Sequence, residues 1–427
     1  MISSQPQPVG YAKKWDSVII GAGAAGLMAG IRANELGAKV LLLEKGKKAG
    51  VKILMSGGTR CNITHHCSNR DIVKAFGKNG ECLHSALAGF GVEDAVAFFE
   101  SEGVQTKVES TGKVFPVSNR ASDVLQALLR RLHRAGGTVW NECPVTDLRS
   151  VNGRFELNTP MGTIDTSKVL LCSGGKSFPR CGTTGEGYEW VKNLGHTIKP
   201  TSPSLVPLTT PLSWVKQLSG ITLKDTLVTA GIGSKALGTD RGAWLFTHFG
   251  FSGPAPMNLS RLLTTSNQKG WLGLDSLPDL KSKEVEDRIL STIPLHGKKT
   301  IASLLSQTFG EAIPLRWAEA LVSQATIFPL KKALEMSRAE RQKVVELLKG
   351  SVLLVDGSGG FEKAEVTSGG VCIKEVNFKT MESKIVPGLF LAGEILDLDG
   401  PIGGYNFQAA WSTGWAAGTS LAKGDLT

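Results

Sequence analysis

The first clear hydrophobic pattern in the chain runs from Val18 to Glu44. Its sequence, VIIGAGAAGLMAGIRANELGAKVLLLE, predicts a buried strand, a glycine turn, a helix of small and apolar residues and a second buried strand. The glycines Gly21, Gly23 and Gly26 have the spacing of a βαβ turn that binds a dinucleotide. We therefore predict a dinucleotide-binding unit here.

Each glycine has its own mechanical role in this prediction. Gly21 allows the tight turn, Gly23 lets the backbone approach a pyrophosphate, and Gly26 lets the helix pack closely on the strand. The unpaired N–H groups and the positive dipole end of the helix then face the phosphates. Glu44 follows Gly26 by eighteen residues, where an acidic side chain accepts hydrogen bonds from a ribose. This motif does not distinguish FAD from NAD.

The hydrophobic pattern changes several times further along the chain. Residues 122–134 predict an amphipathic helix that opens on a serine cap, and residues 138–143 and 163–171 predict strands, so helices and strands alternate as in a doubly wound sheet. Residues 204–273 consist of short β-rich segments bounded by glycine and proline, which predict a small antiparallel barrel or sandwich. Helical periodicity occupies residues 277–350, and strands return in residues 351–371. An apolar strand then ends at Gly393-Glu394, before a final small-residue helix over residues 407–421.

Composition narrows the class of protein. The 427 residues are 41% hydrophobic and include 51 glycines, which suits an α/β protein of two or three domains. The net charge of +10 favours an anionic partner such as a nucleotide, a phosphorylated substrate or RNA, although the basic residues are dispersed, which favours a solvated surface over a dedicated nucleic-acid face. Seven scattered cysteines, no apolar core near the N-terminus and no apolar run of about 18 to 20 residues predict a soluble, cytoplasmic protein without stable membrane insertion.

The end of the chain favours FAD as the bound cofactor. FAD enzymes with this type of βαβ unit commonly use a late strand that ends in Gly-Glu, and Gly393-Glu394 supplies it. Gly403 and Gly404 precede the last predicted helix, whose N-terminal N–H groups could face the flavin edge where reduced flavin gathers negative charge. The glycine-rich regions at both ends of the chain together indicate FAD rather than NAD.

Several motifs in order resemble those of the BaiN/RdsA-like family of FAD-dependent oxidoreductases, which includes aminoacetone oxidase-like flavoproteins. The motifs are GAGAAGL at 21–27, KILMSGGTRCNIT at 52–64, SGGKSFPRCGTTGEGY at 173–188, LFTHFGFSGPAPMNLSR at 245–261, EVTSGGV at 365–371, KTMESK at 379–384 and GEILDLDGPIGGYNFQAAWSTG at 393–414. The resemblance implies an α/β fold with a split Rossmann-like FAD-binding domain (1–203 and 372–427), an inserted antiparallel β-barrel domain (204–273 and 352–371) and a helical insertion domain (274–351).

The resemblance also implies the cofactor contacts. These are Gly21, Ala22, Gly23, Ala24, Ala25, Glu44, Lys45, Lys52, Gly58, Arg60, Cys61, Asn62, Val145 at a strand end, Ser173, Gly174, Gly175, Gly393, Glu394, Asn406 and Phe407. The chain departs from the family pattern at three positions: Val51 replaces an arginine, Thr59 a glycine and His65 an asparagine. The missing arginine removes a possible phosphate contact, and Thr59 could tighten the loop beside the flavin.

Candidate catalytic residues are fewer. Cys61 could protonate a substrate carbon, although a packing cysteine is the simpler interpretation. His248, at the end of a predicted strand, could line the substrate cavity or bond to its own loop. Tyr188 and Tyr405 are further candidate proton donors. The group Cys61, His65, His66 and Cys67 lacks the spacing of a metal site, so we predict no metal.

The function predicted from these residues is hydride transfer through flavin N5, with transient NADH or NADPH as donor and reduction of an activated C=C bond. A second hypothesis is the reduction of uridine in ribosomal RNA, with Arg338, Arg341, Lys343 and Lys349 as a phosphate-binding face. The pattern is also compatible with an amine oxidase of the aminoacetone oxidase type and with a non-enzymatic flavin-binding protein. The substrate is accordingly a small molecule or RNA.

Overall fold

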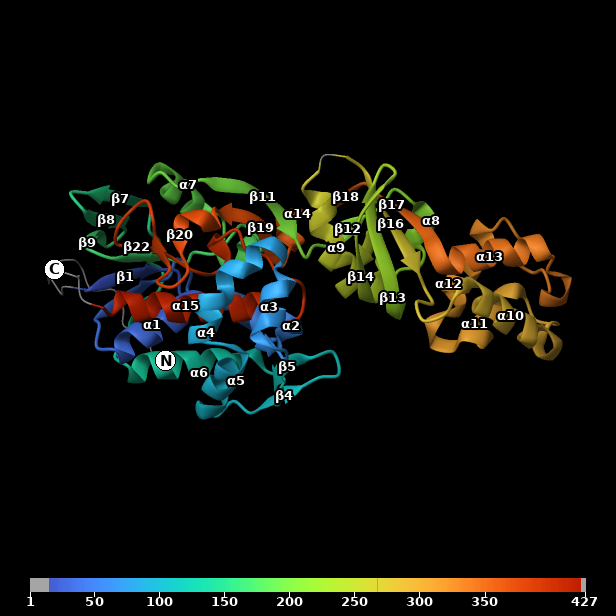
Figure 1. Cartoon of the computed structure of the whole chain (residues 1–427), viewed down its shortest axis with the longest axis horizontal. Helices are drawn as coiled ribbons and strands as arrows, with labels where there is room; N and C mark the ends of the chain where they lie inside the picture. Colours follow the sequence, from blue (N-terminus) through green and yellow to red (C-terminus); the bar gives the residue numbers. More distant parts are fainter. Residues whose placement is uncertain (1–14, 267, 424–427) are drawn as a thin grey trace. The chain divides into compact units, whose positions relative to one another are not determined.

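The computed structural model describes residues 15–266 and 268–423, which fall into two compact units (Figure 1). Unit 1 combines residues up to Thr201 with those from Val366 onward, and unit 2 is Ser202–Glu365. The N-terminal segment that lacks an apolar core in the sequence lies outside the described residues.

Unit 1 is built on a seven-stranded sheet. Its strand order is β20 (Val376–Asn377), β21 (Glu382–Ser383), β22 (Leu389–Leu391), β10 (Val169–Leu171), β1 (Ser17–Ile20), β2 (Val40–Leu43) and β6 (Thr138–Trp140). The strands from β22 to β6 are parallel, whereas β20 and β21 pair in the antiparallel direction at one edge. The chain runs outward through β1, β2 and β6, and then returns to the other side of β1 as β10 and β22. This reversal confirms the predicted doubly wound sheet and places a topological switch point between β1 and β10.

Smaller elements surround this sheet. They are α1 (Ala24–Glu35), α2 (Val51–Thr59), β3 (Thr64–His65), α3 (Asn69–Ala75), α4 (His84–Gly89), α5 (Val92–Ser101), β4 (Thr106–Val108), β5 (Lys113–Pro116), α6 (Ala121–Arg134), β7 (Asp147–Val151), β8 (Arg154–Thr159), β9 (Gly162–Thr166), α7 (Glu186–Asn193), β19 (Val366–Val371) and α15 (Tyr405–Leu421). Strand β11 (Ile198–Ser204) pairs with β19 and runs across the boundary at Thr201. Two predictions need correction. The strand predicted over residues 163–171 is two strands, because β9 belongs to a separate β7–β8–β9 sheet. The predicted serine cap is also wrong, since α6 begins after Arg120 without a side-chain cap.

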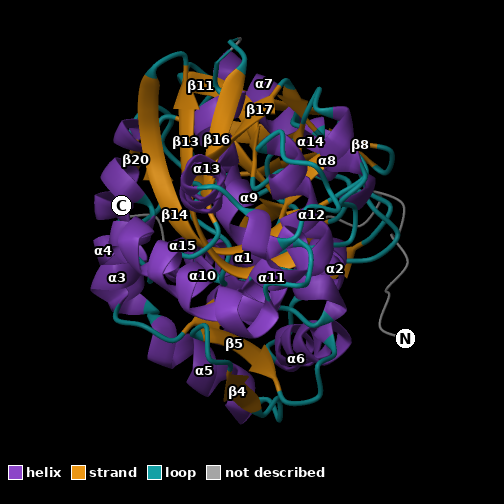
Figure 2. Cartoon of the chain, turned by 90° about the vertical axis from the view of Figure 1, so that its right-hand side faces the viewer, coloured by secondary structure: helices purple, strands orange, loops and turns teal. Residues whose placement is uncertain are grey.

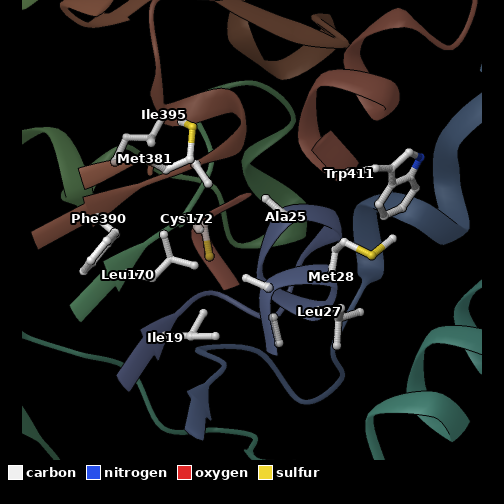
Figure 3. Packing of buried hydrophobic residues seen from close by; sticks show 14 of the residues in the cluster. Ile19, Ala25, Leu27, Met28, Leu170, Cys172, Met381, Phe390, Ile395 and Trp411 are labelled. Atoms are coloured by element: carbon white, nitrogen blue, oxygen red, sulfur yellow. The ribbon is translucent and has the colours of Figure 1, made fainter. Parts of the chain in front are cut away.

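The core of unit 1 depends on close packing between α1 and α15. A Cβ atom at Gly414 would lie 2.4 Å from the carbonyl oxygen of Ala25, and one at Gly418 would lie 2.4 Å from that of Ala29. Only glycine allows the two backbones to approach this closely. Figure 3 shows Ala25, Leu27 and Met28 of α1 among the buried side chains, together with Trp411 of α15. This contact explains the small residues of the predicted last helix.

Unit 2 contains a seven-stranded antiparallel sheet and a group of helices. The strand order is β17 (Ser351–Val355), β16 (Gly270–Asp275), β13 (Thr222–Ile232), β14 (Lys235–Phe246), β15 (Gly250–Ser252), β12 (Leu208–Thr209) and β18 (Gly357–Ser358). Strands β13 and β14 form its long hairpin (Figure 2). The helices are α8 (Ser213–Lys216), α9 (Pro254–Thr264), α10 (Ser282–His296), α11 (Ile301–Phe309), α12 (Leu315–Gln324), α13 (Arg338–Gly350) and α14 (Gly360–Lys363).

Unit 2 has its own hydrophobic core, in which Trp244, Phe246 and Trp317 are fully buried. The β-rich and helical stretches of unit 2 follow the hydrophobic pattern, but α9 lies inside the stretch predicted as strands. Pro254 at its first position favours a helix start, a signal that the flanking strand pattern obscured. Closure of this sheet into a barrel, and the boundaries of three domains, stay predictions.

No single helix among the described residues is long and apolar enough to span a membrane. One bent pair of segments, Gly77–Gly89 with Val92–Ser101, meets the criteria of length and composition when the two are taken together.

Candidate cofactor and active site

Many of the residues predicted to hold the cofactor lie at the carboxyl ends of the parallel strands of unit 1. Residues 21–25 follow β1, residues 44–45 follow β2, residues 173–175 follow β10 and residues 393–394 follow β22. In open α/β sheets, ligands bind outside the carboxyl ends of the strands at the switch point. The fold therefore brings these four predicted segments to the end of the sheet at which such folds bind a ligand.

The surroundings of the three glycines after β1 differ. Gly21 has a φ of +104°, and a Cβ atom there would lie 2.7 Å from the carbonyl oxygen of Cys172. A Cβ atom at Gly26 would lie 1.9 Å from the carbonyl oxygen of Gly21. At Gly23, by contrast, a Cβ atom would meet no described atom within 4 Å. Gly21 and Gly26 are thus required by the fold itself, whereas Gly23 borders open space.

The N-terminus of α1 faces this space without a side-chain cap. Gly23 is its N-cap residue, and the first helical hydrogen bond runs from the Leu27 N–H to the Gly23 oxygen at 2.9 Å. The N–H groups of Ala24, Ala25 and Gly26 precede that bond, so they are the free donors of the helix start. Free donors, a positive dipole end and open space form a suitable cradle for a phosphate group.

Glu44 is held by the same turn. One of its carboxylate oxygens accepts a hydrogen bond from the Ala22 N–H at 3.2 Å, and the other accepts one from the Gly46 N–H at 2.7 Å. Burial raises the pKa of Glu44, while these two N–H groups act in the opposite direction. The neighbouring Lys45 turns away to form an ion pair with Glu186. The turn therefore fixes the Glu44 carboxylate at the end of β2, and its contact with a ribose stays a prediction.

An ion pair links two predicted cofactor residues from distant parts of the chain. Lys52 of α2 pairs with one carboxylate oxygen of Glu394, and the other oxygen accepts a hydrogen bond from the Thr367 N–H at 2.9 Å. The Thr367 hydroxyl oxygen in turn accepts hydrogen bonds from the N–H groups of Lys176 and Ser177 at 2.8 and 3.1 Å. Thr367 thus fixes the segment after Ser173–Gly175. Thr367 lies inside the EVTSGGV motif, but it is not among the site residues predicted from the sequence. Hydrogen bonding to a distant loop leaves no periodic signal in the sequence.

The loop at the end of α2 has a strained backbone. Gly57, Gly58, Thr59 and Cys61 all have positive φ values, and that of the β-branched Thr59 is +68°. Such a φ is costly for threonine. A glycine, which the family has at this position, would adopt this φ without strain. Thr59 replaces that glycine and holds a strained backbone conformation.

Arg60 has structural partners, and the two residues after it are buried. Arg60 forms an ion pair with Glu109 at 2.7 Å, and its guanidinium lies 3.9 Å from the centroid of the Phe115 ring. Cys61 is fully buried, and burial raises the pKa of its thiol to about 12. Asn62 is buried as well. Cys61 and Asn62, which follow the exposed turn at 57–59, are therefore packed into the protein.

Helix α15 offers a second uncapped N-terminus. Gly404 is its N-cap residue in the left-handed conformation, without a side-chain cap, and the first helical bond runs from the Gln408 N–H to the Gly404 oxygen at 3.0 Å. The side-chain amide of Asn406 bonds to both the N–H and the oxygen of Gly400, at 2.8 and 2.9 Å. A cofactor contact at Asn406 would therefore come through its backbone N–H. Phe407 stacks on Trp411 with centroids 5.3 Å apart.

One predicted residue has a setting that differs from the prediction. The resemblance places Val145 at a strand end, but it lies in the irregular segment between β6 and β7. The hydrophobic pattern continues past Trp140 because residues such as Cys143 and Val145 pack into the core after the strand pairing has ended.

Two buried polar atoms test whether the cofactor fits. The hydroxyl oxygen of Ser173 and the amide oxygen of Asn62 have no hydrogen-bond partner among the described residues. Unpaired buried polar atoms cost free energy, so a bound group commonly satisfies them. Both residues belong to the predicted FAD set. With the two uncapped helix starts and the space at Gly23, the residues present fit a dinucleotide.

The candidate proton donors occupy separate places. Tyr188 is buried, and burial raises its pKa. Tyr405 stacks on His65 with centroids 4.7 Å apart, and burial raises its pKa to about 12. His248 lies in unit 2, exposed on the turn between β14 and β15, with its ring edge-on to Phe249. The catalytic roles of Cys61 and His248 stay predictions. Within the described residues, no group of three or more His, Cys, Asp or Glu side chains could hold a metal ion.

The predicted phosphate-binding face of the helical stretch needs correction. Arg341 forms an ion pair with Glu286 at 3.1 Å, and Lys349 forms one with Asp275 at 2.6 Å. Both basic side chains are largely buried, because they tie α13 to α10 and to β16. Two of the four predicted cations therefore stabilise unit 2 and do not form an open face.

Comparisons with known proteins bear on the family and the fold of this chain. A family model described as HI0933-like protein Rossmann domain matches residues 15–420. A 3-dehydro-bile acid delta(4,6)-reductase from Clostridium scindens is 30% identical over 95% of this chain and 98% of its own length. A ribosomal RNA dihydrouridine synthase from Escherichia coli is 31% identical over 96% of this chain and 98% of its own. Among solved structures, the Mycobacterium smegmatis Sdh1 complex in the apo form has a TM-score of 0.50 and 14% identity, covering 96% of this chain and 68% of that one, a likeness of fold.

Proposed function

Because this chain belongs to the family of HI0933-like proteins with a Rossmann domain, we propose that it is an FAD-dependent oxidoreductase that reduces a C=C bond conjugated to a carbonyl group, with NAD(P)H as electron donor. Membership confirms the resemblance seen in the motifs. The observation that carries the proposal is the gathering of four predicted loops, each at the carboxyl end of a parallel strand, with the uncapped start of α1 among them.

The cofactor would be held mainly by backbone donors. The start of α1 and the space at Gly23 suit the pyrophosphate, and Glu44 suits a ribose. The start of α15 suits the edge of the ring system where negative charge gathers on reduction. When bound, the flavin would supply hydride transfer through its N5 atom. The Lys52–Glu394 pair and Thr367 hold the surrounding loops in place.

The names of two relatives favour C=C reduction. One is named for reduction at the Δ4,6 positions of a 3-dehydro-bile acid, and the other for making dihydrouridine. Chemically, dihydrouridine is uridine with its C5=C6 bond saturated, and that bond is conjugated to a carbonyl. A 3-oxo steroid with a Δ4 double bond has the same conjugation. The reactions named for these two relatives therefore share one step, the reduction of a C=C bond conjugated to a carbonyl group. The two relatives are 30% and 31% identical to this chain.

Between these substrate classes, the structure favours a small molecule. Arg341 and Lys349 of the predicted RNA-binding face already have carboxylate partners. Reduction of ribosomal RNA is the second candidate, since one relative is named for it. Oxidation of an amine by O₂ is the third.

The test follows the flavin spectrum under anaerobic conditions. NADH and then NADPH are added to the purified holoenzyme, and bleaching is expected within seconds. A cyclic enone, a uridine-containing ribosomal RNA transcript and O₂ are then offered separately as acceptors, and the enone is expected to restore the oxidised spectrum. Reoxidation by RNA alone would assign the second function. A flavin that only an amine reduces would overturn the reductase proposal in favour of an oxidase.

A further inference from the structure

One corner of unit 2 exposes large apolar side chains. Leu295 is 77% exposed, Phe328 68%, Leu330 66% and Leu334 62%. Large apolar residues are usually scattered singly over a surface, and a group of them indicates an interaction site. These four exceed the exposure of the other large apolar residues in the described part of the chain, except for Val352.

Backbone pairing joins the two segments that carry these side chains. The N–H groups of Ala333 and Leu334 donate to the oxygens of Lys299 and Gly297, at 2.9 and 3.0 Å. An antiparallel bridge joins Thr300 to Lys332. The last turn of α10, which carries Leu295, thus leads into a strand-like pair with the segment that carries Leu330 and Leu334. We call residues 295–299 and 328–334 the apolar corner.

Basic side chains outnumber acidic ones around the apolar corner, where the exposed Glu335 accepts a hydrogen bond from the Lys332 N–H at 3.4 Å. Lys298 and Lys332 are exposed, and neither has an ion-pair partner within the described part of the chain. Within the described residues, the Lys299 ammonium donates to the neutral Gln307, at 2.7 Å. Lys331 is neutralised by Glu340. Three cations without a carboxylate partner among the described residues therefore surround four exposed apolar tips.

This combination fits an anionic lipid surface. Leucine and phenylalanine tips enter the boundary between headgroups and acyl chains, while lysine ammonium groups stay with the lipid phosphates. Single-stranded RNA would require aromatic faces for stacking, and only Phe328 of the four tips is aromatic. A second copy of the chain in an isologous contact would bring the same lysines against each other. We propose that the apolar corner docks unit 2 reversibly onto a membrane surface rich in anionic lipid.

The experiment is a flotation assay with the holoenzyme. Vesicles of phosphatidylcholine alone are compared with vesicles that also contain phosphatidylglycerol, and binding is expected only to the second kind. Leu330→Ser with Leu334→Ser is expected to lower the partition coefficient at least about tenfold, because two leucines leave the apolar boundary. Lys298→Glu with Lys332→Glu is expected to do the same at low salt. Flavin content and Tm, which should stay unchanged, show that the variants fold.

The matched control places serine at Val352 and Leu354, the exposed apolar pair on β17. This variant should bind vesicles as the unchanged protein does. Three results would overturn the proposal: equal binding to both kinds of vesicle or to neither, a dimer in solution that the corner variants break, or RNA binding that the same variants abolish. Loss of binding in the β17 control would also overturn it, because the docking would then not belong to the apolar corner.

Discussion

We expect Gly23→Ser, at the start of α1, to weaken cofactor binding without lowering the stability of the fold. The Gly23 backbone is extended, with φ −84° and ψ −163°, and a Cβ atom there would meet no described atom within 4 Å, so serine fits. Serine is also a preferred N-cap residue, and its hydroxyl would accept hydrogen bonds from the free N–H groups of the first turn. The flavin-free protein should then be unchanged in stability or be stabilised by about 0.3 kcal/mol.

The same substitution should expel the cofactor. The serine side chain occupies the space at the helix start and takes the donors that a phosphate would use. A favourable helix-terminus interaction with an anion is worth up to about 2 kcal/mol, which corresponds to about thirtyfold in Kd. The assay measures the flavin-to-protein ratio after purification, and the Kd of the flavin-free protein for added FAD. Wild-type affinity in Gly23→Ser would refute the assignment of this space to the pyrophosphate.

Gly26→Ser provides the contrast, and Gly89→Ser the control. At Gly26 the new Cβ atom would lie 1.9 Å from the carbonyl oxygen of Gly21, so this variant should lose stability with or without flavin. At Gly89 nothing lies within 4 Å of the new atom, and both stability and flavin content should be kept.

Three further predictions concern stability. Thr59→Gly should raise the free energy of unfolding by about 1 kcal/mol, because glycine adopts the positive φ without strain, and denaturant titration measures it; an unchanged value would mean that Thr59 is not strained. Thr367→Val should lower it by about 2 to 4 kcal/mol, because two loop N–H groups lose their acceptor, whereas Thr367→Ser should keep it. Burial raises the pKa of Cys61 to about 12, so the unfolded chain releases this proton first and stability is lost as the pH rises above about 9. Urea titrations between about pH 9 and pH 11 should therefore show a shallower loss in Cys61→Ala than in the unchanged protein.

Much of the cofactor region was accessible from the sequence because backbone geometry builds it. Glycine spacing reports where a turn, a close approach or a helix start must lie, and the structure places Gly21, Gly23 and Gly26 in those roles. Hydrophobic period likewise located the parallel strands. Side-chain partnerships were harder to predict. Thr367 acts on a loop almost 200 residues earlier, and the ion pairs of Arg341 and Lys349 depend on how α13 packs, which charge counting along the chain does not reveal.

The identity of the proton donor also depends on side-chain surroundings that the sequence does not reveal. The pKa shifts of the candidate residues make the choice among them testable. A general acid works best when its pKa lies near the working pH. Burial raises the pKa of both Cys61 and Tyr405 to about 12, and it raises that of Tyr188 too. If one of these groups delivers the proton, kcat/KM for reduction of the enone should be level between about pH 6 and pH 10, since each stays protonated throughout. A fall in kcat/KM between about pH 6 and pH 8 would exclude all three groups as the proton donor.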